Sequence, residues 1–334
     1  MLVLSNGLTN EADEGFLKVA NSLIKRLKAT DKDIYVVSYE RQSDITDKFI
    51  RINKFMLSRE LIGICKKHKE VLYLPFPARA TATALRIFLL SCFTKSLRVA
   101  LVLKTKMNLL GRLLLNLSGA EIVAFSGDAA EFYAKIVGDK RVIRIKTGVD
   151  TKKFVPVSIE EKRVLKSNYG FAGDKKIVLH VGHLNEGRNI RQLIKISRHY
   201  SVLLVISPRF KYEWNMGLRE ELLAAPNIRI IDEYVANIEQ IYQLSDAYFF
   251  PVVESGKCID VPLSCMEAAA CGLPVITTDY GEMRELKSKN GFYFIDDFDS
   301  ENINKIIQKA LNENKNPREE VLVYDWDNAI NQLV

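Results

Sequence analysis

The chain has 334 residues and a mass of 38.0 kDa, more than a single hydrophobic core usually organises, so we expect two domains. Hydrophobic residues at 48% and charged residues at 27% exclude wholesale disorder. The 5 cysteines lack CxxC spacing, so the sequence indicates neither a disulfide framework nor a zinc site. Its apolar runs are too short to cross a bilayer, and residues 1–4 lack the zones of a signal peptide. We therefore expect a cytoplasmic protein.

The net charge of +7 is unevenly distributed between the two halves of the chain. Residues 1–155 carry 27 basic and 15 acidic residues, a net charge of about +12, whereas residues 156–334 carry 21 and 26, a net charge of about −5. No acidic residue lies between Glu70 and Glu121. This basic stretch contains Arg79, Arg86, Lys95, Arg98, Lys104, Lys106 and Arg112 among apolar runs such as IFLLSCF and LLLNL.

The basic stretch has two interpretations. It is typical of a surface that binds anionic lipid, which would hold the protein peripherally on the inner face of the cell membrane. The alternative is a buried strand and two helices whose charges point to water. Binding of nucleic acid is not expected, because the stretch lacks interleaved stacking aromatics and a known reading motif.

In the first half, short β-rich runs at residues 34–39, 71–76, 99–103 and 122–126 alternate with helical patterns. The first amphipathic helix is expected over residues 16–27, with Leu17, Ala20, Ile24 and Leu27 on one face. Alternating strands and helices predict a parallel sheet covered by helices on both sides.

The second half repeats this alternation, with strands expected at residues 177–182, 202–207, 228–232, 247–252 and 274–278. The sequence TGVDTKKFVPVS at residues 147–158 interrupts the pattern before a polar helix at 160–168. We therefore expect two doubly wound α/β domains, residues 1–155 and 156–334.

Two segments of the second half have the features of a ligand site. In open parallel sheets, ligands bind beyond the carboxyl ends of the strands. At residues 181–190, VGHLNEGRNI, a strand ends at Gly182 and a polar loop leads through His183 and Arg188 into an expected helix. An arginine beside a helix N-terminus suits a diphosphate. The loop is neither a dinucleotide fingerprint nor a P-loop.

The other segment is PVVESGKCIDVPLSCMEAAACGLPVITT, residues 251–278. A strand runs into a long loop, and a helix then ends at Gly272. We expect Glu267 in the first turn of this helix, where it could accept hydrogen bonds from a ribose diol. The alternative for Glu267 is a simple capping residue.

Several ordered motifs resemble the glycosyltransferase family 4, whose members have the GT-B fold of two facing Rossmann-like domains. TGVDTKKFVP resembles the family's NGVDxxxFxP, and VGHLNEGRN resembles its GRLxxEKG loop. SDAYFFPVVE and PLSCMEAAACGLPVITTDYGEMREL resemble its nucleotide-binding strand, helix and following loop. YDWDNAINQL resembles its closing helix, expected at about 323–334, which crosses back to the N-terminal domain.

The resemblance implies roles for the residues at the matching positions. Arg188 and His183 stand at the family's two phosphate-binding positions, although His183 could also be a loop histidine without a ligand. Glu267 corresponds to the ribose-binding glutamate. Donor-binding backbone is implied at Gly182, Leu263 and Ser264.

The first glutamate of the family's E-x7-E pair is replaced here by Ile259. Glu254, thirteen residues before Glu267, and Asp260, seven before it, remain alternatives for the contact with the sugar hydroxyls. In the first half, Glu14 and Gly15 precede the first helix where the family has an acceptor loop. Arg79 is a further candidate for the acceptor, with a solvent-facing position as the alternative.

The implied reaction is transfer of a sugar, with retention, from a UDP- or GDP-sugar to a hydroxyl of a glycan or lipid-linked acceptor. No metal and no cofactor other than this donor is expected. Two alternatives are a related epimerase or phosphorylase and, outside enzymes, a non-catalytic relative that binds a nucleotide or a partner protein.

Overall fold

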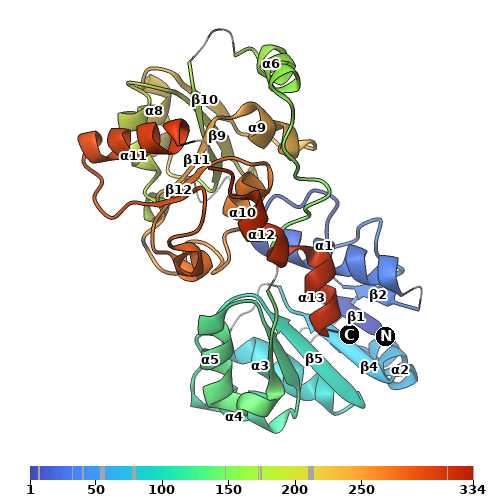
Figure 1. Ribbon diagram of the computed structural model, residues 1–334. Coiled ribbons are helices and arrows are strands. Elements are labelled where there is room, and N and C mark those ends of the chain that lie inside the picture. The colour runs from blue at the N-terminus through green and yellow to red at the C-terminus, as the bar shows by residue number, and fades with distance from the viewer. Residues whose placement is uncertain are drawn as a thin grey trace. The chain divides into compact units, whose positions relative to one another are not determined.

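The computed structural model describes residues 1–6, 8–31, 33–39, 41–52, 57–76, 80–146, 148–171, 173, 175–209, 214–313 and 315–333. The chain forms two compact units (Figure 1). Unit 1 comprises Met1–Thr147 and Trp326–Val334, and unit 2 comprises Gly148–Asp325. Each unit has its own parallel sheet.

Unit 1 contains a seven-stranded sheet in the order β3-β2-β1-β4-β5-β6-β7, and every pairing is parallel. The strands are β1 (Leu2–Ser5), β2 (Tyr35–Ser38), β3 (Lys48–Phe49), β4 (Glu70–Leu74), β5 (Ser96–Leu101), β6 (Glu121–Ala124) and β7 (Val142–Arg144). The helices are α1 (Gly15–Thr30), α2 (Arg59–Lys67), α3 (Ala80–Ser91), α4 (Leu109–Leu117) and α5 (Gly127–Val137). The four strands expected from the sequence are present, and β1, β3 and β7 add to them.

The C-terminal helix α13 (Trp326–Leu333) belongs to unit 1, where it lies beside α1 (Figure 1). The side chain of Arg26 pairs with Asp327 at 3.5 Å, and Arg98 donates to the carbonyl oxygen of Leu333 at 2.7 Å. The division between the units falls at Gly148 instead of residue 156. Gly148 to Val155 stay with unit 2 because Val149 pairs with Asp325, and Thr151 donates to the Asp325 carboxylate at 2.5 Å.

Unit 2 contains a six-stranded parallel sheet in the order β10-β9-β8-β11-β12-β13. The strands are β8 (Ile177–Gly182), β9 (Ser201–Ile206), β10 (Ile228–Ile231), β11 (Ala247–Phe250), β12 (Val275–Thr277) and β13 (Phe292–Phe294). The helices are α6 (Ile159–Asn168), α7 (Leu193–Ile196), α8 (Met216–Ala224), α9 (Ile238–Leu244), α10 (Leu263–Ala270), α11 (Ser300–Asn312) and α12 (Arg318–Val321).

The apolar run of β8 is explained by burial on both faces of the unit 2 sheet. Ile177 and Leu179 pack into one hydrophobic core and Val178 into another, because successive side chains of a strand point to opposite faces. The strand order reverses between β8 and β11, which makes this the topological switch point of the sheet.

The basic stretch of unit 1 folds into α3, β5 and α4. Arg98 and Lys104 are ion-paired with Glu121 and Asp128, and Arg79 lies outside the described residues. Helix α4 exposes the leucines of one face: Leu109, Leu110, Leu113 and Leu117, with Leu109 85% exposed. Within the described ranges, no helix has both the length and the apolar character needed to span a bilayer.

Candidate functional site

The segments singled out in the sequence of unit 2 meet at the switch point of its sheet. The loop after β8 runs from His183 to Gln192, and the loop after β11 runs from Pro251 to α10. Because β8 and β11 are neighbours in the sheet, both loops leave the same part of its carboxyl edge. Ligands of open α/β sheets bind at this position.

Arg188 is a buried cation in the loop after β8. Its side chain is only 6% exposed, and its Nε atom is sealed from solvent without an acceptor among the described residues. The Nη1 atom lies 2.5 Å from the position that a Cβ at Gly182 would occupy, so only glycine permits this placement. A buried, unpaired guanidinium is costly, and an anionic ligand would relieve that cost.

The helix expected after Arg188 is short and begins at Ile190. Arg188 ends a 3-10 turn, η2 (Glu186–Arg188), and a second 3-10 turn, η3 (Ile190–Gln192), continues into the four-residue helix α7. Asn189 follows in the left-handed conformation with φ 56°, which asparagine tolerates better than most residues and which breaks the helix. His183 is half-buried at the start of this loop, and its carbonyl oxygen accepts the N–H of Asn185 at 3.2 Å.

The N-terminus of α10 also lies near Arg188. Cys265 lies in the first turn of α10, and burial raises its pKa well above the ordinary value. The charge of Arg188 acts in the opposite direction, which means that the guanidinium is near this turn. The backbone N–H groups of Leu263 and Ser264 have no acceptor in the described part of the chain. A cation and free N–H donors are therefore close together at the switch point.

Glu267 does not lie in the first turn of α10, as the sequence led us to expect. The helix begins at Leu263 after Pro262, which places Glu267 in the second turn, where its side chain is 4% exposed. The hydroxyl of Tyr242 on α9 donates to its carboxylate at 2.7 Å. Burial and this carboxylate raise the pKa of Tyr242 well above its ordinary value, so the phenol remains a donor.

The two alternatives for the missing first glutamate occupy different surroundings. Glu254 is 58% exposed and pairs with Lys257 at 3.3 Å, and both side chains lie against Gly187, the neighbour of Arg188. Asp260 is half-buried, and its carbonyl oxygen accepts the N–H of Glu282 at 2.8 Å. Glu254 therefore lies beside the Arg188 loop and Asp260 beside the loop that follows β12.

Sequence reasoning missed His180, a buried polar residue of β8. Its side chain is 0% exposed, and Nδ1 lies 2.8 Å from the carbonyl oxygen of Phe249. Burial, together with the nearby charge of Arg188, lowers the pKa of His180 to about 4. The signal was a single histidine within the apolar run IVLHVG, two residues before Gly182.

In unit 1, the candidates for the acceptor follow β1 and β4, at that sheet's own point of reversal. Glu14 is the N-cap of α1, where its carboxylate accepts the N–H of Leu17 at 3.2 Å, and Gly15 begins the helix. Sequence reasoning missed Asn6, a fully buried residue after β1 that accepts the N–H of Phe76 at 2.8 Å. Arg79 follows β4 in sequence but lies outside the described residues.

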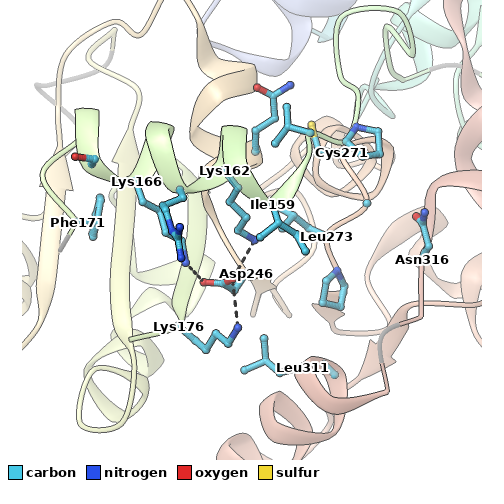
Figure 2. Close-up of a pocket in the computed structure, with 18 of the residues that line it drawn as sticks. Ile159, Lys162, Lys166, Phe171, Lys176, Asp246, Cys271, Leu273, Leu311 and Asn316 are labelled. Atoms are coloured by element: carbon cyan, nitrogen blue, oxygen red, sulfur yellow. Dashed lines mark hydrogen bonds and ion pairs between the residues drawn. The ribbon is translucent and has the colours of Figure 1, made fainter. Parts of the chain in front are cut away.

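A cavity of about 1060 Å³ lies at the opposite, amino-terminal edge of the unit 2 sheet. Figure 2 shows the amines of Lys162, Lys166 and Lys176 converging on the carboxylate of Asp246 there, at 3.0, 2.8 and 3.8 Å. This carboxylate also accepts the N–H of Ile177, the first residue of β8. None of the residues proposed from the sequence lines this cavity. The ion pairs of Lys162 and Lys166 with Asp246 connect α6 to the sheet.

Comparisons with known proteins agree with this organisation. The family described as glycosyl transferases group 1 matches residues 161–321. EpsD of Bacillus subtilis is 28% identical over 152 residues, 43% of this chain and 39% of that protein. Mannosylfructose-phosphate synthase of Agrobacterium fabrum is 25% identical over 191 residues, 52% of this chain and 40% of that protein. The matched stretches thus span about two fifths of these curated relatives.

Among solved structures, HepE of Anabaena in complex with UDP and glucose has a TM-score of 0.78 and 14% identity, covering 100% of this chain and 98% of that one. A glycosyltransferase from Rickettsia africae has a TM-score of 0.75 and 15% identity, covering 99% and 93%. These likenesses confirm the predicted fold class. The group 1 glycosyl transferase family thus matches most of the second unit, and the chain has the GT-B fold.

Proposed function

We propose that the chain is a retaining, metal-independent glycosyltransferase. It moves a hexosyl group from a nucleoside-diphosphate sugar to a hydroxyl of a lipid-linked glycan or polysaccharide precursor. The observation that carries the proposal is Arg188, a buried guanidinium without a counter-ion among the described residues, close to the first turn of α10 in a group 1 domain. HepE was solved with UDP and with UDP-glucose, which favours UDP as the carrier.

The proposed chemistry follows from where negative charge develops. When the bond between the anomeric carbon and the diphosphate breaks, charge accumulates on the leaving phosphate oxygens and the sugar becomes oxocarbenium-like. Arg188 and the free N–H groups of Leu263 and Ser264 would stabilise that charge without reorganisation, as fixed donors do at other developing oxyanions. Glu267, held by Tyr242, would accept hydrogen bonds from the ribose hydroxyls.

A second candidate function is supported by Glu254. The family resemblance implies a carboxylate in contact with the sugar, yet Glu254, one of its two candidates, is largely exposed and paired with Lys257. A non-catalytic relative that binds a nucleotide but turns over no sugar would tolerate this arrangement. Turnover, as opposed to binding, separates the two candidates.

A thermal-shift panel of UDP, GDP, ADP and CMP, with and without chelator, tests the donor site. Because a ligand at about 100 times its Kd stabilises the native state by about 2.7 kcal/mol, we expect one diphosphate to raise the midpoint by several degrees. The shift should persist in chelator and be lost in Glu267→Gln. The exposed substitution Glu319→Gln is the matched control and should keep it. No shift with any nucleotide would contradict both candidates, and a shift that chelator abolishes would contradict metal independence.

We further propose that the protein is cytoplasmic and peripheral, and that α4 binds an anionic membrane surface. Its exposed leucines lie beside Lys106 and Arg112, two exposed cations that have no ion-pair partner in the part of the chain that the structure describes. Apolar side chains provide area for insertion, and each nearby cation adds about 1 kcal/mol of attraction to anionic lipid. A lipid-linked acceptor would be reached from this surface.

Sedimentation with vesicles tests the role of α4. We expect binding to phosphatidylcholine vesicles that contain phosphatidylglycerol, weaker binding at high salt, and little binding to phosphatidylcholine alone. The pair Leu109→Gln and Leu113→Gln should reduce binding at least tenfold, since each leucine loses about 1.5 kcal/mol or more of burial. Val164→Gln with Leu223→Gln, two exposed positions of unit 2, is the control. Equal binding to both vesicles, or by all variants, would exclude α4 as a lipid surface.

A further inference from the structure

Two groups that could pair with each other lie unpaired beside Gly182. The Nε2 atom of His180 and the Nε atom of Arg188 are both sealed from solvent, and neither has a hydrogen-bond partner among the described residues. His180 Nε2 and Arg188 Nη1 lie 3.0 and 2.5 Å from one point, the position that a Cβ at Gly182 would occupy. Buried polar groups without partners are rare in native structures, so both require an explanation.

The tautomer and orientation of the His180 ring are fixed. Since the carbonyl oxygen of Phe249 can only accept, Nδ1 carries the proton and Nε2 is an acceptor. The ring lies nearly parallel to Tyr248 at 6.3 Å and 9°, and to Phe250 at 6.5 Å and 20°. Burial lowers the pKa of His180 to about 4, so the imidazole is neutral near pH 7. A neutral, immobile acceptor therefore faces the region of the Arg188 guanidinium.

We propose that His180 is a positioning residue for Arg188 in the donor complex. When the diphosphate binds, one N–H of the Arg188 guanidinium donates to His180 Nε2, and its remaining N–H groups face the phosphate oxygens. This hydrogen bond gives the buried Nε2 atom of His180 a partner and holds the guanidinium plane across Gly182. The other N–H groups of Arg188 are then already oriented when negative charge develops on the phosphate oxygens. This inference rests on the proposed function, because it requires a diphosphate at Arg188.

A double-mutant cycle on donor affinity tests the proposal. The probe is UDP-glucose, or GDP-glucose if the nucleotide panel selects guanine. His180→Phe keeps an aromatic ring and removes Nε2, and we expect it to raise Kd about tenfold. In an Arg188→Ala background, the same substitution should change Kd less than about twofold, because the group through which it acts is gone. Leu204→Val, at the position of β9 paired in register with His180, is the control for disturbed packing and should leave Kd unchanged.

The nitrogen chemical shift of labelled histidine reports hydrogen bonding at the ring nitrogen, which a change in packing alone would not alter. The chain has only 4 histidines, so single substitutions assign the signals. The Nε2 signal of His180 should shift toward the value of a hydrogen-bonded acceptor when the donor binds, and should not shift in Arg188→Ala at saturating donor. An unmoved Nε2 signal, or equal losses of affinity in both backgrounds, would overturn the inference alone. Failure of the wild type to bind either donor would overturn the proposed function and this inference with it.

Discussion

Replacing Arg188 with Ala is expected to lower the turnover of the nucleotide sugar by about 10²- to 10³-fold, the loss typical when one fixed donor to developing negative charge is removed. The substitution removes a buried cation with no ion-pair partner among the described residues, so the free energy of unfolding should not fall. The measurement is the rate of nucleoside diphosphate release at saturating donor, with the thermal midpoint recorded on the same preparation.

Arg191→Ala is a matched control for Arg188→Ala. Arg191 lies three residues further along the loop, but it is exposed and paired with Glu186 and Glu221, so its loss should change turnover less than about threefold. Gly182→Ala tests the same site from the other side, because the new Cβ would lie 2.5 Å from Arg188 Nη1 and displace it. Equal turnover by wild type and Arg188→Ala would exclude Arg188 from the reaction.

The fold was largely predictable because burial on both faces of a parallel sheet leaves a strong mark on sequence. Strands such as β8 and β9 read as continuous apolar runs, and helices such as α1 show a clear apolar face. Of the strands that escaped prediction, β3, β7 and β13 have only two or three residues, and β1 has four. A pairing of that length depends on its neighbour in the sheet and not on local propensity.

The site was predictable only where a motif fixed the residue. Arg188 was found, but its surroundings were not, since the left-handed Asn189 and the approach of α10 depend on tertiary structure. Glu267 was expected in the first turn but lies in the second, because α10 begins directly after Pro262, earlier than the sequence indicated. His180 escaped because a histidine in an apolar strand is more often a buried, satisfied residue than part of a site.

Asp246→Asn is expected to destabilise unit 2 by about 3 kcal/mol, the cost typical of removing one partner from a buried ion pair. The Asp246 side chain is only 7% exposed, and its charge is shared by Lys162, Lys166 and Lys176 (Figure 2). The asparagine has nearly the same volume and can still accept the N–H of Ile177. The loss of unfolding free energy would therefore measure the contribution of the negative charge. Denaturant unfolding at pH 7 measures it.

The dependence of this loss on pH distinguishes charge from packing. Burial alone would raise the pKa of Asp246, but the lysines, chiefly Lys162, outweigh it and hold the pKa below its ordinary value of 3.8. A carboxyl group with a depressed pKa stabilises the folded state above its unfolded pKa, and that stability disappears as the pH falls through the folded pKa. The difference in unfolding free energy between wild type and Asp246→Asn should therefore be constant from about pH 5 to 8 and shrink only below about pH 4.

Glu221→Gln, which breaks the exposed pair with Arg191, is the control and should lower the free energy of unfolding by less than about 1 kcal/mol. If the loss of unfolding free energy in Asp246→Asn stayed the same at low pH, packing of the side chain, and not its charge, would hold α6 against the sheet.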